Sequence, residues 1–208
     1  MLNIFKKLTN KWLYVIKIRK EEIDMGSKID LKEAIKSNQK FKELILYISK
    51  QCERDDKFGA TKLNKLLFYC DFEAYRQWGK SITGKEYQKL AEGPAPRCML
   101  PVRDEMINID KSLSISPTPF HNLKQDRFIP LREPNTKLFK KEEIELINEI
   151  IEKYRDFNGR EISFESHKFI GYRIMEFNET IPYSLALIGN RPPTEKEIEY
   201  GNSLINER

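Results

Sequence analysis

The chain has 208 residues, of which 39% are hydrophobic and 33% are charged, a composition typical of one globular domain that needs no disulfide framework. The three cysteines (Cys52, Cys70 and Cys98) are odd in number and widely spaced, which favours a reducing, cytoplasmic compartment. No run approaches the roughly 20 apolar residues of a membrane span, so we expect none.

The formal net charge of +5 is confined to the N-terminal segment. Residues 1–20 hold six basic side chains and no acid, so the rest of the chain carries 31 of the 37 basic side chains against all 32 acidic ones. A neutral body gives no general electrostatic basis for binding a phosphate backbone. We therefore expect no nucleic acid among the partners of the folded body.

Residues 1–24 form a basic extension to a domain that we assign to residues 25–208. The apolar run from Trp12 to Ile16 is too short for the core of a signal peptide. The extension could fold onto the body or a partner, touch a membrane surface, or stay a flexible arm. Alternatively, Met25 marks the translation start.

Hydrophobic periodicity predicts two helices in the first half of the body. Within residues 28–52 an apolar stripe consists of Phe41, Leu44, Ile45 and Ile48. A longer central helix is predicted from Thr61 to Gly79, with a buried face of Leu63, Leu66, Leu67, Cys70 and Ala74. Thr61 is placed to cap its start, and Gly79 can adopt the positive φ that ends it. Asp71 and Glu73 are expected on its solvated side.

After the central helix we expect a short strand near Glu86–Leu90 and then a rigid corner formed by Gly93, Pro94, Ala95 and Pro96. A helix over Arg97–Met106 follows the corner. A second extended segment, Arg127–Leu131, is expected to pair antiparallel with the first strand. Pro130 confines it to the edge of this small sheet.

The C-terminal third is predicted to be helical with one extended interruption. A helix over Lys141–Phe157 ends at Asn158-Gly159, and Phe164–Phe177 holds another helix or two short turns. Ile181-Pro182-Tyr183 is extended, and a capping box at Thr194 opens a last helix near 194–207. The predicted fold is mainly α: a compact multi-helix domain with a small antiparallel β-sheet, a helix-dominated α+β class.

The sequence contains no recognisable catalytic or metal-binding pattern. Neither His121 nor His167 has a second ligand at helical spacing, so we predict no metal site and a structural imidazole at both positions. A Cys–His pair assembled in space stays open. Phosphate loops, serine-nucleophile elbows and zinc-protease motifs are absent from the sequence. We expect no enzymatic activity and no cofactor.

An ordered set of short motifs resembles the Panacea (SocA-like) antitoxin-domain family. The motifs are Thr61-Lys62-Leu63-Asn64-Lys65-Leu66-Leu67-Phe68-Tyr69, the aromatic continuation of that helix, Ile82-Thr83-Gly84, Tyr87, Gly93-Pro94-Ala95-Pro96-Arg97, Ser166-His167 and Ile181-Pro182-Tyr183. The resemblance covers roughly residues 37–190. The basic N-terminus has no counterpart in the family pattern.

The resemblance implies an α-rich antitoxin from a bacterial or phage type II toxin–antitoxin module, of the kind that acts in phage defence. Such an antitoxin neutralises a protein toxin, encoded by the adjacent gene, through direct binding. A related branch of the family is similar to an adaptor that delivers its toxin to an ATP-dependent protease. That role and a nucleic-acid-binding regulator are the alternatives.

A toxin-binding surface needs aromatic and arginine anchors. The sequence offers Tyr75, Arg76, Trp78, Tyr87 and Arg97. Each of these side chains could instead serve in ordinary packing or lie solvated on the surface.

The remaining motif residues have two readings each. Gly93, Pro94 and Pro96 would pre-organise the corner for binding, or would only form a tight turn. Lys62 and Lys65 would steer an acidic toxin surface, or would lie on a solvated helix face. Thr61 and His167 are treated as structural motif positions.

Overall fold

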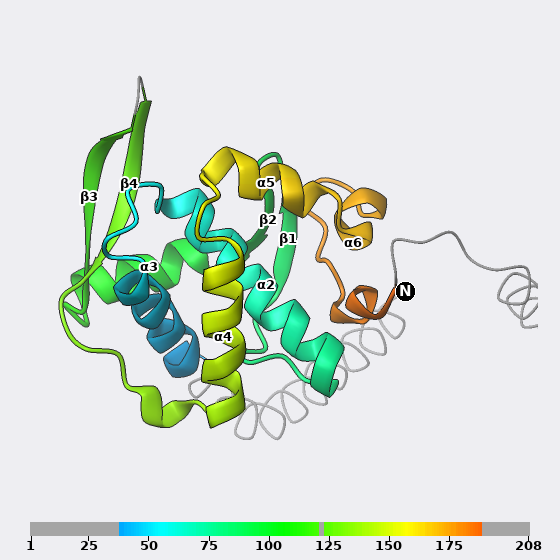
Figure 1. Ribbon diagram of the computed structural model, residues 1–208, viewed down its shortest axis with the longest axis horizontal. Helices are drawn as coiled ribbons and strands as arrows, with labels where there is room; N and C mark the ends of the chain where they lie inside the picture. Colours follow the sequence, from blue (N-terminus) through cyan, green and yellow to red (C-terminus); the bar gives the residue numbers. More distant parts are fainter. Residues whose placement is uncertain (1–37, 121–122, 189–208) are drawn as a thin grey trace, which may run out of the picture.

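The structure, a computed structural model, describes residues 38–120 and 123–188 (Figure 1). Helices predominate, and the strands form two small antiparallel sheets of two strands each. The helix-dominated α+β class predicted from the sequence is therefore confirmed. No helix in the described ranges is long and apolar enough to cross a membrane.

The elements follow one another along the chain with short connections. After a helix over residues 38–51 come α2 (Ala60–Trp78), β1 (Tyr87–Leu90), β2 (Gly93–Pro96), α3 (Met99–Asn108), β3 (Leu113–Phe120), β4 (Leu123–Pro130), the 3-10 helix η1 (Thr136–Leu138), α4 (Lys141–Lys153), α5 (Gly159–His167), α6 (Ile170–Ile174) and η2 (Tyr183–Leu187). The predicted basic extension, residues 1–24, and the predicted last helix near 194–207 lie outside the described residues.

Helix α2 is the centre of the molecule. It packs against β2, α4, α5 and η2, and Figure 1 shows it running behind α4 through the middle of the fold. Its predicted apolar face is buried throughout. The predicted end is confirmed, because Gly79 has φ 68° and donates its N–H to the Tyr75 carbonyl. The predicted start is wrong: Gly59 is the N-cap, no side chain caps the helix, and Thr61 lies within its first turn.

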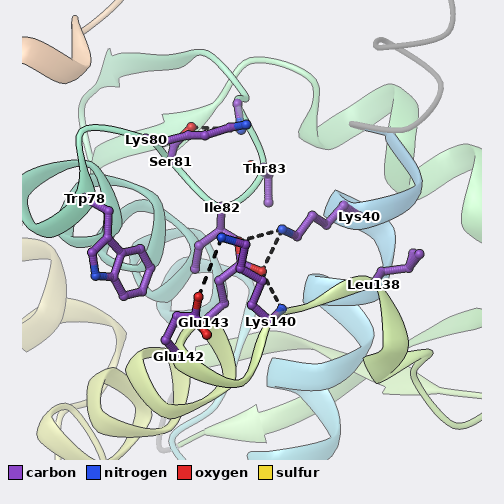
Figure 2. Close-up of a pocket in the computed structure, with 11 residues that line it drawn as sticks. Lys40, Trp78, Lys80, Ser81, Ile82, Thr83, Leu138, Lys140, Glu142 and Glu143 are labelled. Carbon is purple, nitrogen blue, oxygen red and sulfur yellow. Dashed lines mark hydrogen bonds and ion pairs between the residues drawn. The ribbon is translucent and has the colours of Figure 1, made fainter.

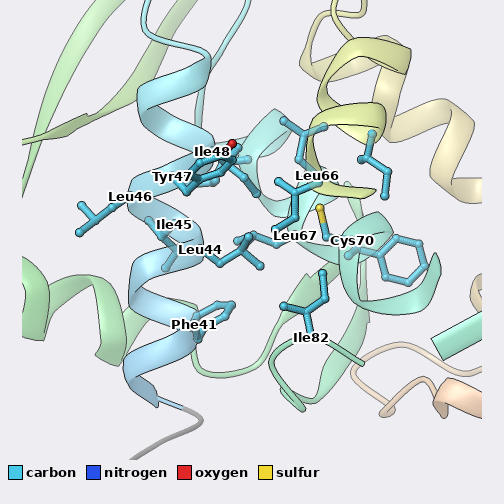
Figure 3. Close-up of a cluster of buried hydrophobic side chains, with 14 of the residues drawn as sticks. Phe41, Leu44, Ile45, Leu46, Tyr47, Ile48, Leu66, Leu67, Cys70 and Ile82 are labelled. Atoms are coloured by element: carbon cyan, nitrogen blue, oxygen red, sulfur yellow. The ribbon is translucent and has the colours of Figure 1, made fainter. Parts of the chain in front are cut away.

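The main core forms where the helix over residues 38–51 meets α2. Phe41, Leu44, Ile45 and Ile48 are completely buried, as their spacing predicts. They meet Leu66 and other α2 residues in the cluster shown in Figure 3. Leu46 and Tyr47 are also buried, so this helix is covered on more than one face. Removing this much apolar surface from water is the chief stabilising contribution to such a core.

The predicted strand pairing is wrong. Strand β1 pairs with β2, placing Tyr87 opposite Pro96, and β3 pairs with β4 in a separate hairpin that projects from one side of the molecule (Figure 1). Arg127 therefore lies opposite Ser116 and not beside the strand near Tyr87. The Gly-Pro-Ala-Pro segment is itself strand β2 rather than a corner.

A late segment of the chain covers the second edge of β1. The N–H of Ile181 donates to the Tyr87 carbonyl at 2.8 Å, and Lys89 exchanges backbone hydrogen bonds with Glu179 and Asn178. Strand β1 is thus flanked by β2 on one side and by residues 178–181 on the other. The extended conformation predicted at Ile181-Pro182 is confirmed, whereas Tyr183 begins η2.

The last described helices deviate from the prediction at their ends. Helix α4 stops at Lys153, short of the predicted Phe157. Asn158 does not end this helix but starts the next one: its side-chain oxygen accepts the N–H groups of Arg160 and Glu161. The Glu161 carboxylate in turn accepts the Asn158 N–H, which completes a capping box for α5.

Candidate functional site

The two lysines of the family-like motif are buried inside the fold, which contradicts both readings made from the sequence. Lys62 and Lys65 are each 1% exposed. The Lys62 ammonium donates to the Asp55 carboxylate at 2.7 Å and to the Arg155 carbonyl at 2.8 Å. A buried ammonium needs such hydrogen-bond partners, because its transfer out of water without them costs several kcal/mol of free energy. Lys62 therefore ties the turn before α2 to the end of α4.

Lys65 completes the backbone hydrogen bonding of β2. In the β1–β2 ladder the Arg97 N–H donates to the Glu86 carbonyl, so the alternate residues 93 and 95 also direct their N–H groups toward β1. Pro94 and Pro96 occupy the outward positions, where their missing N–H groups leave nothing unpaired. The outward carbonyl of Pro94 accepts from the Lys65 ammonium at 2.9 Å.

The burial of Lys65 has an electrostatic consequence. Desolvation favours the uncharged amine and lowers the pKa of Lys65 to about 7, although Glu92 opposes the change. The neutral amine and the ammonium can both donate to the Pro94 carbonyl.

Gly93 is required where β2 presses against α2 and α5. Its φ is +97°, a conformation that side-chain-bearing residues rarely adopt. A Cβ at this position would lie 2.4 Å from Ser166 Oγ and 2.6 Å from Lys65 Cε. The Gly-Pro-x-Pro motif is therefore a packing motif between three elements.

Asp71 is fully buried, and the prediction that it lies on a solvated helix side is wrong. Its carboxylate accepts hydrogen bonds from the Thr83 N–H at 2.7 Å, the Thr83 hydroxyl and the Tyr87 hydroxyl. Burial raises the pKa of Asp71, and these hydrogen bonds oppose that rise. The Ile-Thr-Gly loop and β1 are thereby fixed to the middle of α2.

Tyr87, a candidate anchor for the toxin, is completely buried and cannot contact a partner. Its hydroxyl bonds to Asp71 and to the Leu67 carbonyl, and its ring meets Phe68 and Phe72 edge to face. This residue is a core residue with a satisfied polar end.

Arg97, a second candidate anchor, is bound within the chain. Its guanidinium donates to Thr180 Oγ1 at 2.9 Å, to Gln88 Oε1 at 2.9 Å and to the Asn178 carbonyl. It thus holds the 178–180 segment beside β1. Most of its hydrogen-bonding capacity is used in this clasp.

His167 and Thr61 take structural positions. The His167 ring stacks on Tyr172 with 4.3 Å between centroids, and burial together with nearby Lys65 lowers the pKa of His167. Thr61 packs against Gly159 at the contact between α2 and α5. A Cβ added to Gly159 would lie 3.3 Å from the Cβ of Thr61. His121 lies outside the described residues.

The other three candidate anchors gather at the C-terminal end of α2. Tyr75 stacks on Tyr183 with 5.5 Å between ring centroids, and the exposed Arg76 pairs with Glu73. Trp78 is 42% exposed. Tyr75, Arg76 and Trp78 therefore share the last turn of α2.

Trp78 opens onto a groove of about 770 Å³, which we call the helix-end groove (Figure 2). Four parts of the chain form it: the helix over residues 38–51, the end of α2 with its following loop, η1, and the start of α4. Its lining consists of Lys40, Trp78, Lys80, Ser81, Ile82, Thr83, Gly84, Leu138, Lys140, Glu142 and Glu143. Of these residues the sequence predicts only Trp78 as a site candidate, because the lining extends from position 40 to position 143 and comes together only through the tertiary fold.

The helix-end groove is lined by charged side chains and one aromatic ring. Within residues 38–120 and 123–188, no group of three or more His, Cys, Asp or Glu side chains is arranged to hold a metal ion. Protein interfaces have aromatic residues at their centre and polar residues at their rim, so Trp78 suits the centre of an interface and the lysines and glutamates suit its rim.

Comparison with known proteins gives one match. No curated protein and no solved structure matches the chain. The family model described as antitoxin SocA-like, Panacea domain, matches residues 63–170, from the first turns of α2 to the start of α6 and just over half of the chain. The matched region contains Lys65, Asp71, Tyr87 and the Gly-Pro-Ala-Pro strand, whose contacts hold the domain together. The chain therefore belongs to the SocA-like antitoxin family with a Panacea domain.

Proposed function

We propose that this protein is the antitoxin of a bacterial or phage type II toxin–antitoxin module and that it neutralises its toxin by direct binding in the cytoplasm, without an enzymatic step. The observation that carries the proposal is the Panacea domain over residues 63–170. Lys62, Lys65 and Tyr87 of the motifs are buried in the scaffold, so the face that distinguishes one toxin from another is free to vary outside them. The near-neutral body favours a protein partner over a nucleic acid.

The test is co-expression with the product of the adjacent gene. We expect the neighbour to stop growth when expressed alone, the pair to restore growth, and the two proteins to elute together from a sizing column. The same cultures should contain undiminished amounts of toxin, because a bound toxin is inactive but intact.

Three other outcomes would overturn neutralisation by binding. Restored growth with loss of the toxin, reversed in a host that lacks its ATP-dependent proteases, would identify a proteolytic adaptor. Restored growth with abundant toxin and no complex would identify enzymatic reversal of the toxin's damage. A toxic neighbour that the pair fails to restrain would remove the antitoxin function altogether.

A further inference from the structure

We propose that the helix-end groove is the surface that receives the toxin, and that the toxin fills it with an acidic side chain next to an apolar one. This inference rests on the proposed antitoxin function and assigns it to one face of the molecule. Its two components are an exposed aromatic wall and a lysine that has no ion pair or hydrogen bond among the described residues.

The aromatic wall is the side chain of Trp78. Figure 2 shows its indole on one side of the groove and Lys40 and Leu138 on the other. Trp78 is 42% exposed. Covering its indole would remove a large apolar surface from water. Tryptophan in a concave site is the residue type that most often dominates the affinity of a protein interface. An apolar side chain of the partner can pack on this ring.

The acidic component follows from the ion pairs around the groove. Glu143 binds Lys40 at 2.7 Å with little exposure of either side chain, and Glu142 lies 3.6 Å from Lys140. Both acids of the lining thus have lysine partners. The exposed Lys80 has no ion pair or hydrogen bond with the part of the chain that the structure describes, and one positive charge remains for a carboxylate of the partner.

The walls of the groove are held in place before any partner arrives. Gly79 and Gly84 have φ of 68° and 70°, and the Gly84 N–H donates to Ser81 Oγ at 3.0 Å. Thr83 is bound to the buried Asp71. The Glu143 carboxylate accepts both the Lys140 N–H and the Lys40 ammonium. A site fixed in this way loses little conformational entropy on binding.

A second exposed surface serves as the competing assignment. On α5 and α6, Phe164 is 66% exposed and borders a hollow of about 380 Å³ with His167, Lys168 and Arg173. This α5–α6 hollow is half the volume of the helix-end groove, and two adjoining helices form it rather than four separated parts of the chain. Its Lys168 is already paired with Glu165 at 2.6 Å.

The experiment compares matched variants of the full chain on the two surfaces. In the groove we would make Trp78→Ala and Lys80→Glu, and on the α5–α6 hollow Phe164→Ala and Arg173→Glu. All four side chains are exposed, so thermal unfolding should match that of the wild type. Binding to the purified adjacent-gene product is measured by titration at two salt concentrations.

We expect Trp78→Ala to raise Kd about tenfold or more. Lys80→Glu should also raise Kd, and this increase should be larger at low salt than at high salt. The two α5–α6 variants should stay within about twofold of the wild type. Reversing one acidic residue of the toxin to lysine should restore binding to Lys80→Glu.

The outcomes separate the surface from the function. If the wild type binds and Phe164→Ala or Arg173→Glu weakens binding while the groove variants do not, the toxin uses the α5–α6 hollow and the inference is overturned. If all four variants bind like the wild type, the function stands and the groove assignment falls. If the wild type itself does not bind, the proposed function fails, and the groove assignment falls with it.

Discussion

The burial of one side chain couples the protonation of Lys65 to the folding of the whole domain. The ammonium is almost completely buried and meets the Pro94 carbonyl, and no carboxylate is within ion-pair distance among the described residues. Sequence periodicity could not show this burial. A lysine in the first turns of a helix is normally solvated, and only the presence of β2 against this face makes it a core residue.

The first prediction concerns pH. The pKa of Lys65 is about 7 in the folded chain, against an ordinary value of 10.5. Between these values the unfolded chain holds a proton that the native chain lacks, so the free energy of unfolding rises with pH, by at most about 1.4 kcal/mol per unit. Chemical denaturation from pH 7 to 10.5 should show a steeper rise for the wild type than for Lys65→Met.

Lys137→Met is the control for this pH series, because Lys137 is exposed on η1. It should follow the wild-type slope. Equal slopes for the wild type and Lys65→Met would contradict a lowered pKa at Lys65.

The second prediction concerns Gly93. In Gly93→Ala the new methyl group would meet Ser166 Oγ and Lys65 Cε at distances that real contacts do not show, in addition to the strain of a φ near +97°. We expect a loss of stability of about 2–5 kcal/mol, measured by denaturant unfolding. Gly93→Ala combined with Ser166→Gly should recover the part of this loss that is due to crowding against Ser166 Oγ. No recovery would mean that backbone strain and crowding against Lys65 account for all of it.

At the scale of elements, the helices were more predictable than the sheets for a physical reason. Apolar spacing along α2 and α4 reports burial directly, because the helical period is local. Strand pairing depends on which edge of a strand needs hydrogen-bond donors, and that edge is determined by residues far away in the sequence. Pro94 and Pro96 predict a break, yet they occupy the edge of β2 where no donor is needed.

The same reasoning applies to the hairpin. Pro117 and Pro119 alternate along β3 in the same way, opposite Asp126 and Lys124. These prolines weaken the strand pattern of β3, so the sequence does not predict it as the partner of β4 and places Arg127–Leu131 in the wrong sheet.

The third prediction concerns Asn158, which the sequence predicts at the end of a helix and which the structure places at the start of α5. Asn158→Ala removes the acceptor for the Arg160 and Glu161 N–H groups and should destabilise the domain by about 1 kcal/mol. Asn158→Gly should cost only a few tenths of that amount, because solvent can reach the freed N–H groups. Thermal unfolding distinguishes them, since 1 kcal/mol corresponds to about 2–4 °C in a domain of this size. Equal effects of the two variants would exclude a capping role.

At the scale of the whole molecule, the fold class and the central place of α2 could be predicted, whereas the binding surface could be predicted only in part. Residue type alone predicts the aromatic and arginine anchors. It does not distinguish a surface anchor from a core residue such as Tyr87 or from an internally bound side chain such as Arg97. Trp78 stayed a candidate because it follows the last buried turn of α2. Its neighbours in the groove come from elsewhere in the chain.

The fourth prediction uses the cysteines as reporters of global unfolding. Cys52 and Cys70 are buried, and burial raises the pKa of Cys52 to about 12 and that of Cys70 well above its ordinary value. Cys98 is only partly buried. A thiol reagent at pH 8 should therefore modify Cys98 first, and Cys52 and Cys70 at a rate that follows unfolding. Rapid modification of all three in the native protein would contradict this packing.

The segment that covers β1 also determines how short a usable fragment can be. The family match ends at residue 170, yet residues 178–181 bond to Tyr87 and Lys89. A fragment that ends at the family boundary would leave these backbone groups open and would remove Thr180 and Asn178, two of the partners of Arg97. An open strand edge recruits other chains, so such a fragment should self-associate and precipitate. Interaction screens and crystallisation should use fragments that extend at least through Tyr183, whose hydroxyl bonds to the Lys85 carbonyl.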